Sequence, residues 1–126
     1  NYTTAREMAY LLEQIYRREL VDRFSSELML DIMVHNKSTS RLARWLPADW
    51  ELGHKTGLLR RSCHDVGIIF SPKGDYILAV LTGHVRSYKT AKNFISKIAK
   101  ITFDYYEENA GSALVRSGDK SSGTRG

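Results

Sequence analysis

The chain has little of several features on which whole classes of protein depend. Its 126 residues include a single cysteine, Cys63, so no disulfide can form within the chain. No apolar run approaches the roughly 18 residues of a membrane helix, so a membrane protein is not expected. The basic excess is small, 19 residues against 14 acidic ones, and it forms no block interleaved with aromatic residues. Nucleic acid is therefore not an expected partner either.

A convincing set of metal ligands is also missing. Cys63, His64 and Asp65 are adjacent, and adjacent residues of a strand do not converge on one ion. We therefore expect no metal and no other cofactor. The other histidines are interpreted as a helix-cap residue, a strand-surface residue and a loop residue, in the order His35, His54 and His84.

The length and the apolar content limit the size of the folded unit. With 126 residues, 42% of them hydrophobic, the chain can form one core and is one domain or part of one. The sequence shows no signal peptide and starts with Asn1 rather than Met, shortly before a strong helix start. We therefore expect a processed or truncated chain.

Two helices are predicted at the beginning of the chain. Thr4 and Glu7 form a capping box, and the apolar spacing that follows predicts a helix over 4–20. Ser25 or Ser26 is expected to cap the second helix. The residues expected on the buried face of this second helix are Leu28, Met29, Ile32 and Met33. The segment after it is predicted to contain a short helical turn.

From Glu51 onwards the hydrophobic period changes to alternation, which indicates strands. Three antiparallel strands are predicted over 51–58, 64–71 and 76–82, because short turns connect them. The last of these is the most apolar segment, so we expect it to be buried on both faces. Trp45 and Trp50 are expected to cover one end of the core.

A long helix closes the predicted fold. It is expected to begin at Thr90 and to end near Asn109. The residues expected on its buried face are Ala91, Phe94, Ile95, Ile98, Ile101, Thr102 and Tyr105. The fold class is therefore α+β, in which helices are followed by three antiparallel strands and a long C-terminal helix packed on the sheet.

The candidate binding site lies in the first strand, at Lys55, Thr56 and Gly57. A cation, a hydroxyl and a backbone without a side chain stand in consecutive positions, which suits an anionic ligand. Alternation places Lys55 and Thr56 on opposite faces, so both can serve one site only at a strand edge. We therefore predict that this strand lies at the rim of the sheet. Arg60 and Arg61 can also attract a carboxylate, although solvated turn charges are an equal alternative.

Five segments occur in an order and at a spacing that are more specific than any one of them. They are residues 1–8, Arg41-Leu42 with Leu46-Pro47, residues 54–57, residues 64–69 with Pro72 and Gly74, and residues 76–82 with the helix after them. Together they resemble the C-terminal half of class A β-lactamases and their penicillin-recognising relatives. The resemblance implies a partial β-lactamase/transpeptidase-like domain over 1–109, helical over 1–49, with the sheet and its closing helix over 50–109. Residues 110–126 are predicted to be a disordered tail.

The chemistry of that family depends on motifs that the resemblance places before Asn1. These are the nucleophilic Ser-x-x-Lys, a Ser-Asp-Asn motif and usually a deacylating glutamate. None of these motifs is found before the predicted tail. The one literal Ser-x-x-Lys, residues 117–120, lies in that tail and is interpreted as chance. The resemblance therefore implies a fragment that is inactive alone.

The resemblance also implies roles for the candidate site. Lys55 would provide a positive field for the substrate carboxylate and for proton transfer around the missing serines. Thr56 would donate a hydrogen bond to that carboxylate, and Gly57 would let the substrate lie against the strand. The backbone N–H of Leu58 would supply one of two oxyanion donors. Lys55 and Leu58 are thus the predicted catalytic residues, and Lys55, Thr56 and Gly57 are the predicted substrate-binding residues.

The leading hypothesis is a β-lactamase-type serine hydrolase that opens a β-lactam ring through an acyl-enzyme. A D,D-peptidase or glutaminase of the same superfamily and a non-catalytic binding relative remain as alternatives. The expected ligand is a β-lactam or a peptidoglycan-like carboxylate, and a family-like protein would be exported to the periplasm or the exterior. The strand 76–82 would lack its family neighbour, so we expect it to pair with a missing N-terminal segment or to self-associate.

Overall fold

The computed structural model describes residues 1–119 of the chain, with the backbone alone described for 110–119. The elements in order are α1 (Ala5–Tyr16), α2 (Arg23–Val34), the 3-10 helix η1 (Arg41–Ala43), β1 (Glu51–Leu59), β2 (Ser62–Ser71), β3 (Gly74–Gly83) and α3 (Tyr88–Asp119). This order confirms the predicted α+β class. Among the described residues, no helix combines the length and apolar character needed to cross a bilayer.

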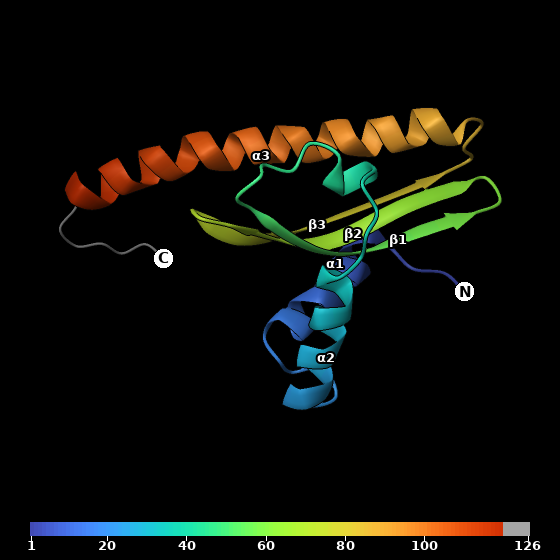
Figure 1. Ribbon diagram of the computed structural model, residues 1–126, viewed down its shortest axis with the longest axis horizontal. Coiled ribbons are helices and arrows are strands. Elements are labelled where there is room, and N and C mark those ends of the chain that lie inside the picture. The colour runs from blue at the N-terminus through green and yellow to red at the C-terminus, as the bar shows by residue number, and fades with distance from the viewer. Residues whose placement is uncertain (120–126) are drawn as a thin grey trace.

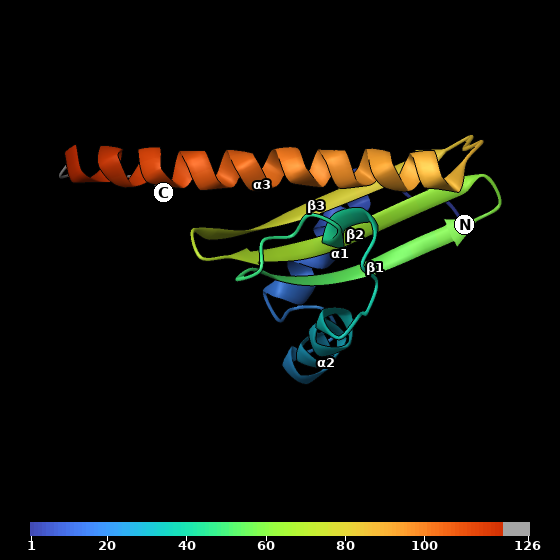
Figure 2. The ribbon, with the colours of Figure 1, turned by 45° about the horizontal axis from the view of Figure 1, so that its top comes forward.

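The sheet separates two layers of helix. Its strands lie in the order β1-β2-β3, and both neighbouring pairs are antiparallel. Helix α3 and η1 lie along one face, whereas α1 and α2 project from the opposite face (Figures 1 and 2). Each face therefore needs its own apolar layer.

Two clusters of buried side chains fill these layers. The cluster between the sheet and α3 comprises Leu42, Trp50, Leu52, Cys63, Ile69, Val80, Ala91, Ile95, Ala99 and Phe103. The cluster on the side of α1 and α2 is smaller and comprises Leu12, Ile15, Leu30, Met33, Val66 and Ile68. Both clusters include side chains of β2, because this central strand is covered on both faces.

The burial of β3 differs from the prediction. Most of its residues are only half-buried, and among the described residues its outer edge has no partner strand. The expectation that 76–82 is buried on both faces is therefore wrong, because the most apolar strand lies at the edge and β2 at the centre. The unpaired edge of this strand is as predicted in the described part of the chain.

The first helix begins as the capping box predicts and ends earlier. The hydroxyl of Thr4 accepts from the Glu7 backbone N–H, while the Glu7 carboxylate accepts from the Thr4 N–H. The helix ends at Tyr16 rather than at residue 20. Arg18 and Val21 both have a φ of 65°, a left-handed conformation that breaks the helical path.

The second helix is capped by a residue that the sequence analysis did not select. The side chain of Asp22 accepts from the Ser25 N–H at 2.7 Å, so the predicted Ser25 or Ser26 cap is wrong. This hydrogen bond lowers the pKa of the Asp22 carboxyl. The hydroxyl of Ser26 instead bridges the backbone N–H and C=O of Leu20. His35 closes the helix, as predicted.

Two helices turn a partly different face to the core than predicted. On α2, Met33 is buried as predicted, together with Leu30, whereas Leu28 and Ile32 are exposed. On α3, Ala91 and Ile95 are buried as predicted, together with Ala99 and Phe103, whereas the predicted Phe94, Ile101 and Tyr105 are exposed. In each case the helix carries a second apolar stripe, and the position of the sheet decides which stripe is covered.

The bounds of α3 also differ from the prediction. Helix α3 begins at Tyr88 and continues to Asp119, so the predicted end near Asn109 is wrong. Residues 120–126, the rest of the predicted tail, lie outside the described residues, and so does the last residue of the Ser-x-x-Lys match.

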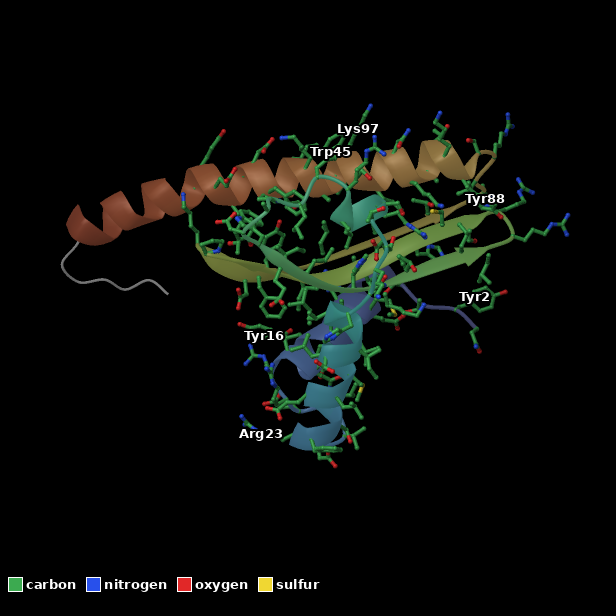
Figure 3. The ribbon with its side chains drawn as sticks, viewed as in Figure 1. Tyr2, Tyr16, Arg23, Trp45, Tyr88 and Lys97 are labelled. Carbon is green, nitrogen blue, oxygen red and sulfur yellow. The ribbon has the colours of Figure 1, made fainter. Side chains whose placement is uncertain are left out.

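The two tryptophans have different environments. Trp50 is buried and meets Phe103 edge-on, with ring centroids 5.5 Å apart. Trp45 is half exposed, lies over α3 beside Lys97 (Figure 3), and has the Arg44 guanidinium 4.8 Å from its ring. Only Trp50 therefore covers the core as predicted.

Candidate functional site

The Lys55-Thr56-Gly57 segment lies in β1, at the edge of the three-stranded sheet of the described residues. Lys55 pairs with Val66, whose side chain belongs to the α1/α2 layer, and Thr56 pairs with Asp65 on the α3 side. The two candidate side chains thus stand on opposite faces of a rim strand, as predicted. Lys55 is exposed and Thr56 is half-buried.

A buried histidine–aspartate pair adjoins this segment on the α3 face. The Nδ1 atom of His54 lies 3.0 and 2.9 Å from the two carboxylate oxygens of Asp65. The side chains are 2% and 0% exposed. Because a carboxylate only accepts, His54 presents its Nδ1–H to Asp65. The prediction that His54 is a strand-surface residue is therefore wrong.

The space for this pair comes from a glycine on the neighbouring strand. Gly67 stands opposite His54 in the antiparallel register. A Cβ atom at Gly67 would lie 3.0 Å from His54 Cβ, 3.0 Å from a methyl of Leu52 and 3.1 Å from the Gly53 carbonyl. A side chain at this position would therefore require His54, Leu52 or the Gly53 backbone to shift by a few tenths of an ångström.

Asp65 also ties the strands to η1. Its Oδ2 accepts the backbone N–H of Leu42 at 3.1 Å. The side-chain amide of Asn36 donates to the His54 carbonyl at 3.0 Å. The backbone before Lys55 is therefore held by contacts from three separate parts of the chain, which limits its conformational freedom.

Arg41 lies beneath the same segment. Its Nη1 donates to the carbonyls of Gly57, at 3.3 Å, and His64, at 3.4 Å. The residue is buried and has a φ of 59°, a left-handed conformation that is costly for a side chain of this kind. The hydroxyl of Ser96 donates to its carbonyl at 2.8 Å and helps to hold that backbone in place.

The other face of the segment is more open. The ammonium of Lys55 donates to the Thr56 carbonyl at 2.6 Å. His64 stands opposite Gly57, and its Nδ1 accepts the Thr82 backbone N–H at 3.1 Å. A Cβ at Gly57 would lie 3.3 Å from the His64 ring, so glycine lets the two strands approach here.

Arg60 and Arg61 form the two-residue turn between β1 and β2 and are exposed. Arg61 has a φ of 61°, and its carbonyl accepts the Val85 N–H. The Tyr88 hydroxyl donates to the Leu59 carbonyl at 2.9 Å, which ties the start of α3 to this hairpin (Figure 3). The side chain of Leu58, the residue expected to offer its backbone N–H, is half exposed.

The structure thus shows two features that sequence reasoning missed, the His54–Asp65 pair and the buried Arg41. The pairing register of β1 and β2 contains a signal for the His54–Asp65 pair. Once the Arg60-Arg61 turn is fixed, His54 and Asp65 must lie on the same face of neighbouring strands. Among the described residues, no group of three or more His, Cys, Asp or Glu side chains gathers around a common metal position.

Comparison with known proteins now places this architecture. The model of the beta-lactamase enzyme family matches residues 1–106, most of the chain. The chain belongs to this family. None of the curated protein sequences compared with the chain matches it.

Solved structures share the fold of this beta-lactamase family member. A beta-lactamase from Sphaerobacter thermophilus DSM 20745 superposes with a TM-score of 0.73 at 23% identity, over 79% of this chain and 38% of that one. PBP-A superposes with a TM-score of 0.76 at 22% identity, over 84% of this chain and 40% of that one. A PBP-A variant solved as an acyl-enzyme complex with penicillin G has a TM-score of 0.77 at 23% identity, with the same coverage. The chain therefore spans about two fifths of the length of these structures.

Proposed function

We propose that the chain is the C-terminal part of a β-lactamase-type serine hydrolase and that Lys55, Thr56 and Gly57 bind the carboxylate of a β-lactam or peptidoglycan-like ligand. The observation that carries this proposal is the place of the segment in a family member: a rim strand in which an exposed lysine and a half-buried threonine occupy consecutive positions, one on each face of the strand edge. The penicillin G complex of a PBP-A variant supports the ligand class.

The charges around the segment favour an anion. Among the described residues, no carboxylate lies within ion-pair distance of Lys55, and the buried guanidinium of Arg41 adds a second positive charge below the strand. A negative charge placed at the rim gains Coulomb energy from both cations, which is opposed in part by the buried Asp65 carboxylate opposite Thr56. The Thr56 hydroxyl can donate a hydrogen bond to the same group.

For catalysis we propose that the Leu58 backbone N–H acts as an oxyanion donor. Such a donor is worth about 2.7–4 kcal/mol of activation free energy, but only when a nucleophile attacks and an oxyanion forms. The sequence contains no Ser-Asp-Asn motif, and its one Ser-x-x-Lys is the match over 117–120. We therefore propose that these residues alone bind ligand without turning it over.

Two measurements on the purified chain test this proposal. Nitrocefin absorbance should show no hydrolysis, while benzylpenicillin should shift the backbone amide NMR signals of residues 55–58. Lys55→Ala should weaken this binding by about tenfold or more, because it removes a charge-assisted contact. Lys73→Ala, an exposed lysine in the β2–β3 turn, is the matched control and should bind as the parent does.

The outcomes separate the hypotheses. Hydrolysis by these residues alone would show that a nucleophile is present after all. Absence of any shift at 55–58 would refute the carboxylate site. Turnover that appears only when a segment carrying Ser-x-x-Lys and Ser-Asp-Asn is added would establish the hydrolase. Binding without turnover in both cases would favour the non-catalytic relative, and cleavage of a D-Ala-D-Ala peptide instead of nitrocefin would favour a D,D-peptidase.

We also propose that a second polypeptide segment, or a second copy, covers the surfaces that this chain leaves open. Exposed apolar side chains line α2 at Phe24, Leu28 and Ile32, and the outer edge of β3 is unpaired in the described part of the chain. Such surfaces favour association.

An exported location is proposed from the family alone, and cell fractionation of the encoded protein tests it.

A further inference from the structure

Residue 54 of β1 is anchored from two sides, directly before the Lys55-Thr56-Gly57 segment. Toward the core, the Nδ1–H of His54 donates to the Asp65 carboxylate at 2.9 Å, and both side chains are buried. At the backbone, the His54 carbonyl accepts the side-chain amide of Asn36 at 3.0 Å. The position of β1 is therefore fixed at the residue that precedes Lys55.

The same anchor controls the edge of β1 that faces away from β2. Alternate residues of a strand direct their backbone groups to the same edge. The carbonyls of His54 and Thr56 both accept side-chain donors, from Asn36 and Lys55. The Leu58 N–H has the same orientation as these two residues, so the proposed oxyanion donor lies on the edge at which His54 is held.

Asp65 joins this edge to the buried Arg41. Its Oδ2 also accepts the backbone N–H of Leu42 at 3.1 Å, and Leu42 directly follows Arg41 in η1. One carboxylate thus holds β1 through His54 and holds η1 through Leu42. The two cations of the proposed site, Lys55 and Arg41, are therefore positioned relative to one another through Asp65.

Stability alone does not account for a polar pair at this place. The His54–Asp65 pair lies on the sheet face that carries the apolar cluster against α3. Apolar side chains of similar volume often replace a buried charged pair at no cost in stability, because burying charge sacrifices hydration. In the described part of the chain, the His54 ring forms hydrogen bonds through Nδ1 alone, so it completes no wider polar network. What apolar side chains cannot supply is a directional bond that fixes the strand.

We propose that His54 is a positioning residue of the Lys55-Thr56-Gly57 site. Its Nδ1–H bond to Asp65 sets the edge of β1 relative to Arg41, so that the segment and the Leu58 N–H contact one ligand. His54 acts through the backbone, because its side chain is buried against Asp65. This inference rests on the proposed carboxylate site and adds a residue on which the geometry of that site depends.

Two substitutions separate the hydrogen-bond donor from the filled space. His54→Asn places a side-chain N–H close to the position of Nδ1, whereas His54→Leu fills the space without a donor. In amide NMR titrations of the whole chain with benzylpenicillin, His54→Leu should bind about tenfold or more weakly than the parent. His54→Asn should recover most of this loss. Ile15→Val, in the buried layer on the opposite face of the sheet, is the control for general destabilisation and should bind as the parent does.

Hydrogen exchange measures the positioning of β1 without any ligand. The amides of Lys55 and Gly57 face β2, and they should exchange faster in His54→Leu than in the parent or in His54→Asn. The amides between β2 and β3 should keep their exchange rates in all three chains. A general loss of stability would accelerate exchange in both regions, so it is distinguishable from a local loss of positioning.

The outcomes distinguish this inference from the proposed function. If the parent binds at residues 55–58 and His54→Leu binds equally well, the positioning role is wrong and the carboxylate site stands. Equal losses in His54→Leu and His54→Asn would also refute the role, because the donor would then not matter. If the parent does not bind, the carboxylate site is refuted; faster exchange confined to Lys55 and Gly57 would still support the positioning of β1, and unchanged exchange would overturn it.

The amide spectrum of each variant shows whether it is folded. If His54→Leu does not fold, His54→Gln takes its place, because its amide N–H lies one bond farther from the backbone. His54→Gln should bind benzylpenicillin more weakly than His54→Asn does. Equal binding by the glutamine and asparagine variants would contradict the positioning role.

Discussion

The two faces of the sheet are built differently, and the difference explains how the site strand is held. On the α3 face, a buried ionisable pair and a buried arginine join β1, β2 and η1 through hydrogen bonds. On the α1/α2 face, the apolar cluster is smaller and a stripe of α2 remains exposed. The α3 face therefore fixes the geometry of the Lys55-Thr56-Gly57 segment, whereas the α1/α2 face is open to a further partner.

The largest effect is expected from breaking the buried pair. Asp65→Ala leaves the His54 Nδ1–H and the Leu42 N–H without an acceptor in a dry environment. Each buried donor left without an acceptor costs about 1–3 kcal/mol, so the free energy of unfolding in urea should fall by about 2 kcal/mol or more. Asp65→Asn keeps one acceptor oxygen and should cost less.

The urea unfolding measurement has a control on the α1/α2 face of the sheet. Glu13→Ala removes an exposed partner of Arg17 and should cost no more than about 1 kcal/mol. If Asp65→Ala and Glu13→Ala had equal effects, the buried pair would not be the stronger constraint. The comparison between the two faces would then fail.

A smaller effect on stability, and a larger one on association, is expected from the open stripe of α2. Ile32 is 63% exposed in the described structure. Ile32→Glu should therefore change the free energy of unfolding by no more than about 0.5 kcal/mol. It should also reduce self-association, or binding of an added N-terminal segment, in sedimentation velocity experiments. Asp31→Asn, a neighbouring exposed position that stays polar, serves as the control.

The order of the elements could be predicted from local signals. The capping box at Thr4, the alternation from Glu51 and the tight turn at Pro72 each act within a few residues, and each is found where predicted. The covered face of α2 could not be predicted, because Leu28 and Ile32 form a stripe as apolar as that of Leu30 and Met33. Which stripe is buried depends on the rest of the fold.

The candidate site was predictable only in part, because some of its features follow from local patterns and others depend on distant residues. The position of Lys55 and Thr56 on a rim strand follows from alternation, which is a local property. The burial of His54 depends on a carboxylate 11 residues away, across a hairpin, and on a glycine opposite it. The placement of Arg41 depends on a left-handed backbone that no sequence period announces.

The smallest predicted effect concerns the pKa values of two tyrosines at the same end of the sheet. Burial against α3 raises the pKa of Tyr76, although its hydrogen bond with Thr102 opposes this. On the other face, the pKa of Tyr16 is raised chiefly by its hydrogen bond to Asp75, at 2.8 Å. Both raised values mean that the protonated tyrosine favours the folded state. The resulting stability is full below about pH 10 and is lost as the pH rises through the folded pKa.

Asp75→Asn separates the two causes. It removes the carboxylate that holds the Tyr16 proton, so ultraviolet absorbance should show Tyr16 ionising at lower pH than in the parent chain. The pKa of Tyr76 should stay raised, because the desolvation by α3 and the ring stack with Tyr106, at 3.8 Å between centroids, are untouched. Tyr16→Phe and Tyr76→Phe assign the two transitions. If Asp75→Asn lowered both pKa values equally, charge rather than burial would control the α3 face, and the contrast between a dry face and an open one would not hold.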